Sequence, residues 1–313
     1  VDSALCKYYG QEVTIERHEV RKNNGVLLQG ICVLETGRCV APTIYLNGYL
    51  EKYERGSTFS EIIQEIIDCC EKYKIHRDLN MDFFMQYEKV RKKLAYRMIH
   101  YERNKELLQT VPHRRFCEFA VVCHCVIMDD EIGSGTILIN NSHMESWHIT
   151  ESTLFEDAAK SSIRLQPYRL CKISEIVKEA VEHIAGYKME EISREYPIDN
   201  EEVLEKTVNH MLQELEENSI RMYVLTNEGR YFGASCLYYP NMLECIGNWL
   251  KSDYYVLPSS VHEVIILPES DETAKTNYST MVQEVNALQV DPEEWLSDCA
   301  YLYRRSKKEL TVL

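Results

Sequence analysis

The feature that most restricts the possible folds of this chain is an order of elements that occurs twice. It consists of a strand, a polar turn, a second strand and a helix. The first occurrence has strand-like runs at 119–128 and 136–140, joined by an acidic turn at 129–135. A helix then begins at Thr150. Two strands joined by so short a turn pair as a hairpin, so this segment predicts a hairpin followed by a helix.

The same order begins again about a hundred residues later. Residues 221–226 and 234–239 predict strands, 227–233 a turn, and Asn241 caps a helix that runs to Leu250. A chain that mixes hairpins with amphipathic helices buries the apolar face of one against the other. The sequence therefore predicts an α+β fold, with mixed sheets built largely from hairpins and with helices on at least one face.

The first part of the chain predicts a small α+β unit. Strand-like segments at 12–20 and 26–34 flank Asn23-Asn24-Gly25, residues that tolerate positive φ in a tight hairpin turn. Thr58 and Glu61 can form a capping box at the start of a helix whose isoleucines share one apolar stripe.

A polar stretch at 74–80 is the best candidate for a domain boundary. It predicts a small N-terminal unit at 1–78 and a larger mixed α/β body at 79–313. The apolar spacing over 81–94 then predicts a second helix at the start of the body.

The charge of the chain argues against two classes of partner. Its 35 Lys and Arg residues against 50 Asp and Glu residues give a net charge of −15. Such a surface repels nucleic-acid phosphates and anionic lipid headgroups. No apolar run approaches the roughly 18 residues of a membrane span. We therefore expect neither a nucleic-acid nor a membrane partner.

The twelve cysteines are scattered, and several fall at apolar positions of predicted strands and helices. This is typical of buried free thiols in a reducing compartment, which predicts a cytoplasmic protein. The chain has no C-x-x-C pair, no G-x-G-x-x-G and no Walker loop, so it predicts no structural metal and no nucleotide cofactor bound through those motifs.

Six phrases carry a resemblance to a known family. They are APTIYLNGYLEKYERG, YERNKELLQTVPHRRF, INNSHMESW, MYVLTNEGRYFGA, YYVLPSSVHEVIILPE and VNALQVDPEEWLSD. In this order, across nearly the whole chain, they resemble an uncharacterised family of bacterial proteins, common in gut anaerobes, that is classed as a domain of unknown function. The VLPSSVHEVIIL region is more distantly similar to the YtpQ-like family. The resemblance implies a cytoplasmic α/β or α+β protein and transfers no catalytic residue.

The first candidate site is the polar turn that contains Ser259, Ser260, His262 and Glu263. A serine hydrolase needs a serine within hydrogen-bond reach of a histidine that a carboxylate orients. Neighbours on a strand alternate sides, so His262 and Glu263 should point apart. The sequence also lacks the G-x-S-x-G elbow and the second histidine of H-E-x-x-H. A turn that leads into a buried strand is the favoured interpretation, and a ligand-binding loop is the alternative.

A second candidate contains Asn141 and His143, just before the helix at Thr150. With neighbouring polar residues they could supply metal ligands if the segment folded back on itself. Polar groups that cap a helix explain the same residues at less cost, and this interpretation is favoured.

The third candidate is His113, Arg114 and Arg115, a cationic run before a buried strand in an otherwise acidic chain. These side chains could hold a carboxylate or a phosphate through charge-assisted hydrogen bonds. Pairing with some of the surplus acidic side chains is the favoured alternative.

These candidates leave two classes of function. The first is a binding or protein-interaction module without a cofactor, which takes a protein partner or a small anionic ligand. The second is a hydrolase whose polar residues converge at strand ends around His113, His143 and His262. Self-association through an exposed sheet edge is a further possibility.

Overall fold

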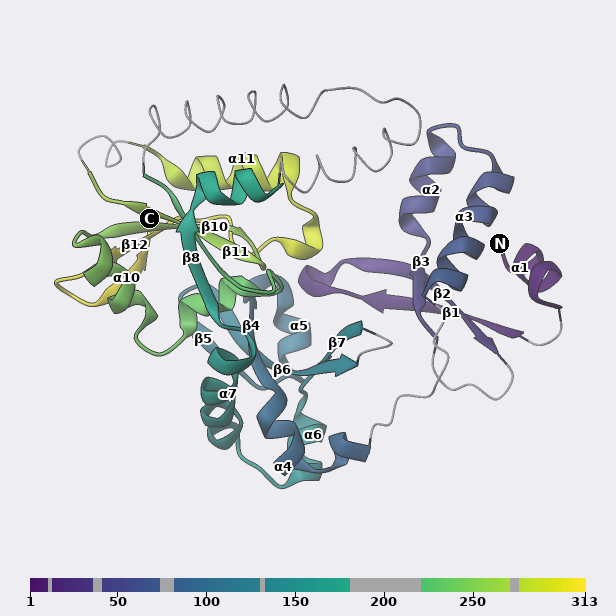
Figure 1. Cartoon of the computed structure of the whole chain (residues 1–313), viewed down its shortest axis with the longest axis horizontal. Helices are drawn as coiled ribbons and strands as arrows, with labels where there is room; N and C mark the ends of the chain where they lie inside the picture. The colour runs from purple at the N-terminus through teal and green to yellow at the C-terminus, as the bar shows by residue number, and fades with distance from the viewer. Residues whose placement is uncertain (11–12, 36–40, 74–81, 130–132, 181–220, 271–275) are drawn as a thin grey trace, which may run out of the picture.

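The computed structural model describes residues 1–10, 13–35, 41–73, 82–129, 133–180, 221–270 and 276–313. The strands of this part form three sheets, and every strand pairing in them is antiparallel (Figure 1). The α+β class and the hairpin construction are thus confirmed. The expectation of mixed sheets is wrong for the described residues, since each strand runs against its neighbours.

The N-terminal sheet consists of β1 (Val13–Arg21), β2 (Leu27–Glu35) and β3 (Thr43–Tyr45), in that order. The turn η2 (Asn23–Gly25) joins β1 to β2, with Asn24 and Gly25 at φ 59° and 72°. Both residue types tolerate this left-handed conformation, so the predicted hairpin forms where the sequence places it.

Three helices accompany this sheet, α1 (Asp2–Tyr9), α2 (Asn47–Glu54) and α3 (Phe59–Lys72) (Figure 1). The capping box of Thr58 and Glu61 is present at the start of α3, as the sequence predicts. The α3 isoleucines pack with Leu5, Ile31 and Ile44 in a buried cluster that contains no residue beyond Cys70. The division at residue 78 remains a prediction, because residues 74–81 lie outside the described part.

The central sheet is organised around β6 (Phe119–Asp129). Strand β4 (Leu94–His100) pairs along one edge of β6, while β5 (His113–Phe116) and β7 (Gly133–Leu138) follow one another along the other edge. Helix α7 (Glu151–Leu165) packs against β4 and β6. The predicted hairpin and helix are confirmed here, although residues 130–132 of the turn lie outside the described part.

The third sheet has the order β13-β12-β10-β11-β9-β8. Its strands are β8 (Tyr168–Lys172), β9 (Tyr223–Asn227), β10 (Tyr254–Ser260), β11 (Glu263–Pro268), β12 (Tyr301–Arg304) and β13 (Glu309–Val312). Helix α11 (Tyr278–Gln289) packs against one face of this sheet and buries the Tyr255 and Leu257 side chains of β10. The other face shares a core with the central sheet.

The remaining described elements are short, apart from α10. They are η3 (Asp82–Met85), α4 (Tyr87–Val90), η4 (Arg91–Lys93), η5 (Glu102–Asn104), α5 (Lys105–Leu108), α6 (Asn141–Trp147), η6 (Gly233–Tyr238), α10 (Met242–Leu250) and η8 (Pro292–Glu294). The continuous helix predicted over 81–94 is wrong, because this segment is a series of single turns that leads into β4.

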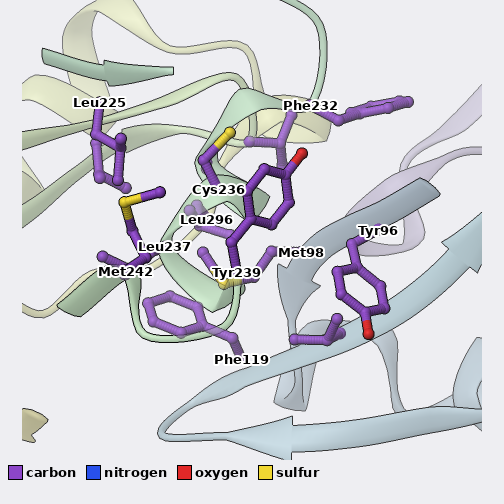
Figure 2. Close-up of a cluster of buried hydrophobic side chains, with 14 of the residues drawn as sticks. Tyr96, Met98, Phe119, Leu225, Phe232, Cys236, Leu237, Tyr239, Met242 and Leu296 are labelled. Atoms are coloured by element: carbon purple, nitrogen blue, oxygen red, sulfur yellow. The ribbon is translucent and has the colours of Figure 1, made fainter. Parts of the chain in front are cut away.

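The residues of this shared core also show that the second occurrence of the predicted strand-turn-strand-helix unit is different from the prediction. Figure 2 shows Met98 and Phe119 of the central sheet beside Leu237 and Met242. The strand predicted at 234–239 is instead the 3-10 helix η6, whose residues Gly233–Leu237 are all buried. A single buried turn brings Cys236 and Leu237 into the core, whereas a strand would alternate its side chains between two faces. The second occurrence of the unit is therefore incomplete.

Candidate ligand-binding cavity

A cavity of about 890 Å³ lies where the tip of the β1–β2 hairpin meets the rest of the molecule. Its walls are the hairpin tip, the face of the central sheet that points away from the shared core, the residues before η6, the β10–β11 turn and the segments η5, α5 and η8. Several parts of the chain that are distant in sequence thus enclose one space, which is typical of a ligand site.

The hairpin tip is anchored by side-chain amides. Asn23 Nδ2 donates to the carbonyl oxygen of Glu293 at 2.7 Å, and Asn24 Nδ2 donates to that of Trp295 at 2.8 Å. Asn104 in η5 accepts from the Asn24 backbone N–H and donates to the Asn24 side-chain oxygen, both at 2.9 Å. These bonds explain why a surface hairpin forms a stable wall of the cavity.

Arg97 is the unusual residue of the cavity. It lies on β4 between Tyr96 and Met98, whose side chains enter the shared core, so the alternation of the strand turns Arg97 to the cavity face. Its Nε is buried and has no hydrogen-bond partner. No side-chain hydrogen bond or ion pair joins Arg97 to any residue that the structure describes. Burial lowers the pKa of the Arg97 guanidinium, and the nearby Tyr231 and Glu293 oppose this shift with smaller contributions.

The ring of Phe232 is what Arg97 contacts. Arg97 Cζ lies 4.1 Å from the ring centroid, a cation–π geometry. Phe232 has a left-handed φ of 56°, and Figure 2 shows its ring pointing away from the packed leucine and methionine side chains. The imidazole of His262 is parallel to it, with centroids 5.7 Å apart and an interplanar angle of 8°. Phe232 therefore brings the guanidinium and the imidazole to one wall.

Both nitrogens of the His262 ring are occupied. Nδ1 accepts the Phe232 backbone N–H at 3.1 Å, which leaves the proton of a neutral ring on Nε2. Nε2 lies 3.3 Å from Glu294 Oε1 and can donate to it. Ser260 Oγ accepts the backbone N–H of His262 at 3.0 Å and does not meet the ring. The serine–histidine pair that a hydrolase needs is absent from this turn.

Behind Phe232 lies a second histidine with unusual surroundings. His124 is 1% exposed, and neither ring nitrogen has a partner. Its ring meets that of Phe232 edge-on at 5.5 Å. Burial, with a smaller contribution from the Arg97 charge, lowers the pKa of His124 to about 3, so the ring is neutral at physiological pH.

Most other cations of the cavity wall are already paired. Arg21 forms an ion pair with Glu106, Lys105 with Glu102, and Arg103 with Asp298 at 2.8 Å. Lys22 lies over the ring of Tyr45, with Nζ 4.3 Å from the centroid. Glu293 also lines the wall, and its carboxylate has no ion-pair partner among the described residues. Arg97 and Lys22 are thus the cations of the wall without an ion pair among the described residues, and Arg97 has a completely buried Nε that lacks a hydrogen-bond partner.

The cationic run on β5 does not form a common site. Arg114 Cζ lies 4.6 Å from the ring centroid of Phe155, and its Nε is 3.8 Å from Glu151. Arg115 Cζ lies 4.1 Å from the ring centroid of Tyr101. His113 Nδ1 is 2.9 Å from the Val111 carbonyl oxygen. None of the three lines the cavity, and each has a contact within the chain.

The residues around α6 act as a helix cap. The Asn140 side chain accepts the backbone N–H of His143 at 3.0 Å, and His143 Nδ1 accepts the backbone N–H of Asn140 at 3.2 Å. The Asn141 side chain donates to the Gln109 carbonyl oxygen at 3.4 Å. The sequence favours a capping role for these residues but assigns it to the helix at Thr150, whereas the structure has them cap α6, and Thr150 itself caps α7.

Of the four candidate residues at the β10–β11 turn, His262 alone lines the cavity. Ser259 is half-buried at the end of β10, and Glu263 is opposite Ser260 in the register, beside an irregularity between Pro258 and Ser260. Sequence reasoning missed Arg97 and Phe232. For Arg97 a signal was present, because it is the only charged residue within the run Leu94–Ile99.

The described residues also bear on metal sites and membrane-spanning helices. They contain no group of three or more His, Cys, Asp and Glu side chains that could hold a metal ion. Among the same residues, no helix has the length and apolar character that crossing a membrane requires.

Comparison with known proteins gives a family but no activity. Residues 1–305 match the model of a family of unknown function, DUF5688, which confirms the expected resemblance to a family of unknown function across nearly the whole chain. No curated protein and no solved structure matches the chain.

Proposed function

The chain belongs to this family of unknown function, and from its cavity we propose that the protein binds a small anionic ligand, with Arg97 as the residue that holds the anion. One observation carries the proposal. Arg97 is half-buried at the cavity wall, its Nε is completely buried without a hydrogen-bond partner, and no described carboxylate lies within ion-pair distance of it. A buried polar group without a partner costs about 1–3 kcal/mol, and a bound anion offsets this cost.

The hydrolase alternative has less support. Its three histidines belong to different surroundings, with His113 beside a backbone carbonyl and His143 in a helix cap. His262 lines the cavity, but Phe232 and Glu294 occupy its two nitrogens. A general base needs a lone pair free to take a proton from the reacting group.

We also propose that the protein acts in the cytoplasm. All the cysteines of the described residues are free, and Cys123, Cys125 and Cys236 are completely buried. Buried thiols without disulfides suit a reducing compartment. The net charge of −15 argues against nucleic acid as the partner. A protein partner and self-association through a sheet edge remain predictions.

The test compares three proteins by isothermal titration calorimetry against a panel of small carboxylates and phosphates. They are wild type, Arg97→Gln, and Lys308→Gln as a control that removes a cation paired with Glu244 outside the cavity wall. We expect at least one anion to bind wild type and the control alike and to bind Arg97→Gln about 10- to 100-fold more weakly, the range for a hydrogen bond to a charged group. An anion that binds all three proteins equally would overturn the proposal, as would a panel in which nothing binds.

A further inference from the structure

We infer that the ligand is a small monocarboxylic acid with an apolar body. This inference rests on the proposed function and narrows the ligand to one chemical class. The inference depends on the charges that line the cavity and on the apolar surface left exposed beside Arg97.

The charges favour a ligand with a single negative charge. Arg97 offers a planar guanidinium that matches the two oxygens of a carboxylate. A second negative charge would face the carboxylates of Glu293 and Glu294, which line the same space. The guanidiniums of Arg21 and Arg103 are held by Glu106 and Asp298, which leaves Lys22, over the Tyr45 ring, as the one other cation of the wall without an ion pair among the described residues. A second negative charge therefore meets two carboxylates against at most one such cation.

The apolar walls favour a carbon body rather than a polar one. Leu107 and Leu138 line the cavity and are only half-buried, and Tyr231 exposes 50% of its surface. The Tyr231 ring lies beside the Phe232 ring, which already contacts Arg97. Leu107 and Leu138 pack against the cluster that contains Ile99 and Val122, on the same wall. A ligand that places its carboxylate on Arg97 can cover this surface with its body, and the removal of apolar area from water stabilises the complex.

The size of the cavity leads to the same conclusion. A volume of about 890 Å³ lies within the range of sites for drug-sized molecules. A carboxylate alone occupies a small fraction of it and leaves the leucine side chains in water. Affinity should therefore grow with the carbon chain of the acid, by about fourfold for each methylene that becomes buried.

The experiment measures the affinities of acetate, butyrate, hexanoate and octanoate for the full chain by calorimetry. Hexanamide tests the charge without changing the chain length, and succinate, pyrophosphate and ATP test the number of charges. We expect affinity to rise along the acid series, to be lost with the amide, and to be weaker for the multiply charged ligands than for octanoate.

Three variants test the walls separately. Arg97→Gln should weaken octanoate about 10- to 100-fold. Glu293→Gln should strengthen succinate more than octanoate, because it removes a charge that repels the second carboxylate. Leu138→Ala should reduce the gain per methylene, whereas Leu50→Ala, on the exposed surface of α2, should leave it unchanged.

The possible results separate this inference from the proposed function. If pyrophosphate or ATP binds more tightly than octanoate and depends on Arg97, the inference is wrong while the proposed function stands. If affinity does not change along the acid series, the inference is also wrong. If no ligand of either kind depends on Arg97, both are wrong. Circular dichroism of each variant shows that it is folded before its affinity is interpreted.

Discussion

Replacing Arg97 by methionine should stabilise the ligand-free protein. Methionine keeps an unbranched apolar stem of similar length, so the contacts along β4 and with Phe232 are largely preserved. The change removes a charge that is largely desolvated and has no acidic partner among the described residues. The variant therefore isolates the cost of holding an unpaired guanidinium at the cavity wall.

The magnitude follows from two opposing contributions. Removing an unpaired polar group from a buried position recovers about 1–3 kcal/mol, and more for a charge. The loss of the cation–π contact with Phe232 costs about 0.5–2 kcal/mol. Because Arg97 is partly exposed to the cavity, the lower part of both ranges applies, with about 1.5 kcal/mol recovered and about 0.5 kcal/mol lost. The net result is a gain of about 1 kcal/mol in the free energy of unfolding, or roughly 2–4 °C in Tm.

The assay is urea denaturation of wild type and Arg97→Met at neutral pH, followed by circular dichroism. The expected result is a higher denaturation midpoint for the variant with an unchanged slope. Lys105→Met, at a paired and exposed cation, is the control and should change the free energy of unfolding by less than about 0.5 kcal/mol. A loss of stability of 1 kcal/mol or more in Arg97→Met would refute the reasoning, since it would mean that Arg97 has a partner within the protein.

Three further predictions concern the surroundings of the cavity. His124 has a folded-state pKa of about 3, against 6.5 for an unperturbed histidine, so protonation favours the unfolded state below pH 6.5. Between pH 8 and pH 5 the free energy of unfolding of wild type should therefore fall by about 2 kcal/mol more than that of His124→Gln, measured by urea denaturation at each pH. Gly233→Ala should destabilise the protein by about 1–3 kcal/mol, because a Cβ there would lie 2.6 Å from the His262 carbonyl oxygen. Gly48→Ala, where a Cβ would have no atom within 4 Å, should not destabilise it, and equal denaturation midpoints for the two variants would contradict this. Asn24→Gly keeps the left-handed turn but removes the side-chain bonds of the hairpin tip, so octanoate should bind more weakly by calorimetry, and an unchanged affinity would show that this anchor does not shape the cavity.

The parts of the fold that local chemistry determines could be predicted from the sequence. The β1–β2 hairpin depends on Asn24 and Gly25, which accept positive φ, and the start of α3 depends on Thr58 and Glu61, three residues apart. Both signals lie within a few neighbouring residues and need no information about the rest of the chain.

The parts that depend on distant contacts could not. The spacing over 81–94 is periodic enough to suggest a helix, but β4 begins at Leu94 because it pairs with β6, some thirty residues later. The strand expected at 234–239 is η6, because the shared core accepts a buried turn there. Tertiary packing overrides local preference in both places.

The site shows the same limit. The sequence singled out His262 as a polar residue in a turn, but Phe232 and Glu294, which set the state of its ring, lie about thirty residues away on either side. Arg97 was missed because the helix predicted over 81–94 hid the start of β4, and no element was predicted between Leu94 and Phe119. Once β4 is known to be a strand, a single arginine among apolar residues on its cavity face becomes the strongest functional signal in the chain.

If the cavity exists to hold an anion on Arg97, the order of stability between wild type and Arg97→Met should reverse when the ligand is added. Without ligand, the free energy of unfolding of the variant is higher than that of wild type by about 1 kcal/mol, because the unpaired charge is gone. At about 100 times the wild-type Kd, binding adds about 2.7 kcal/mol to wild type, whereas a variant weakened about 100-fold gains only about 0.4 kcal/mol. With octanoate, the free energy of unfolding of wild type from urea denaturation should then exceed that of the variant by roughly 1 kcal/mol. A variant that stays ahead at every octanoate concentration would show that the charge of Arg97 does not serve to bind this acid.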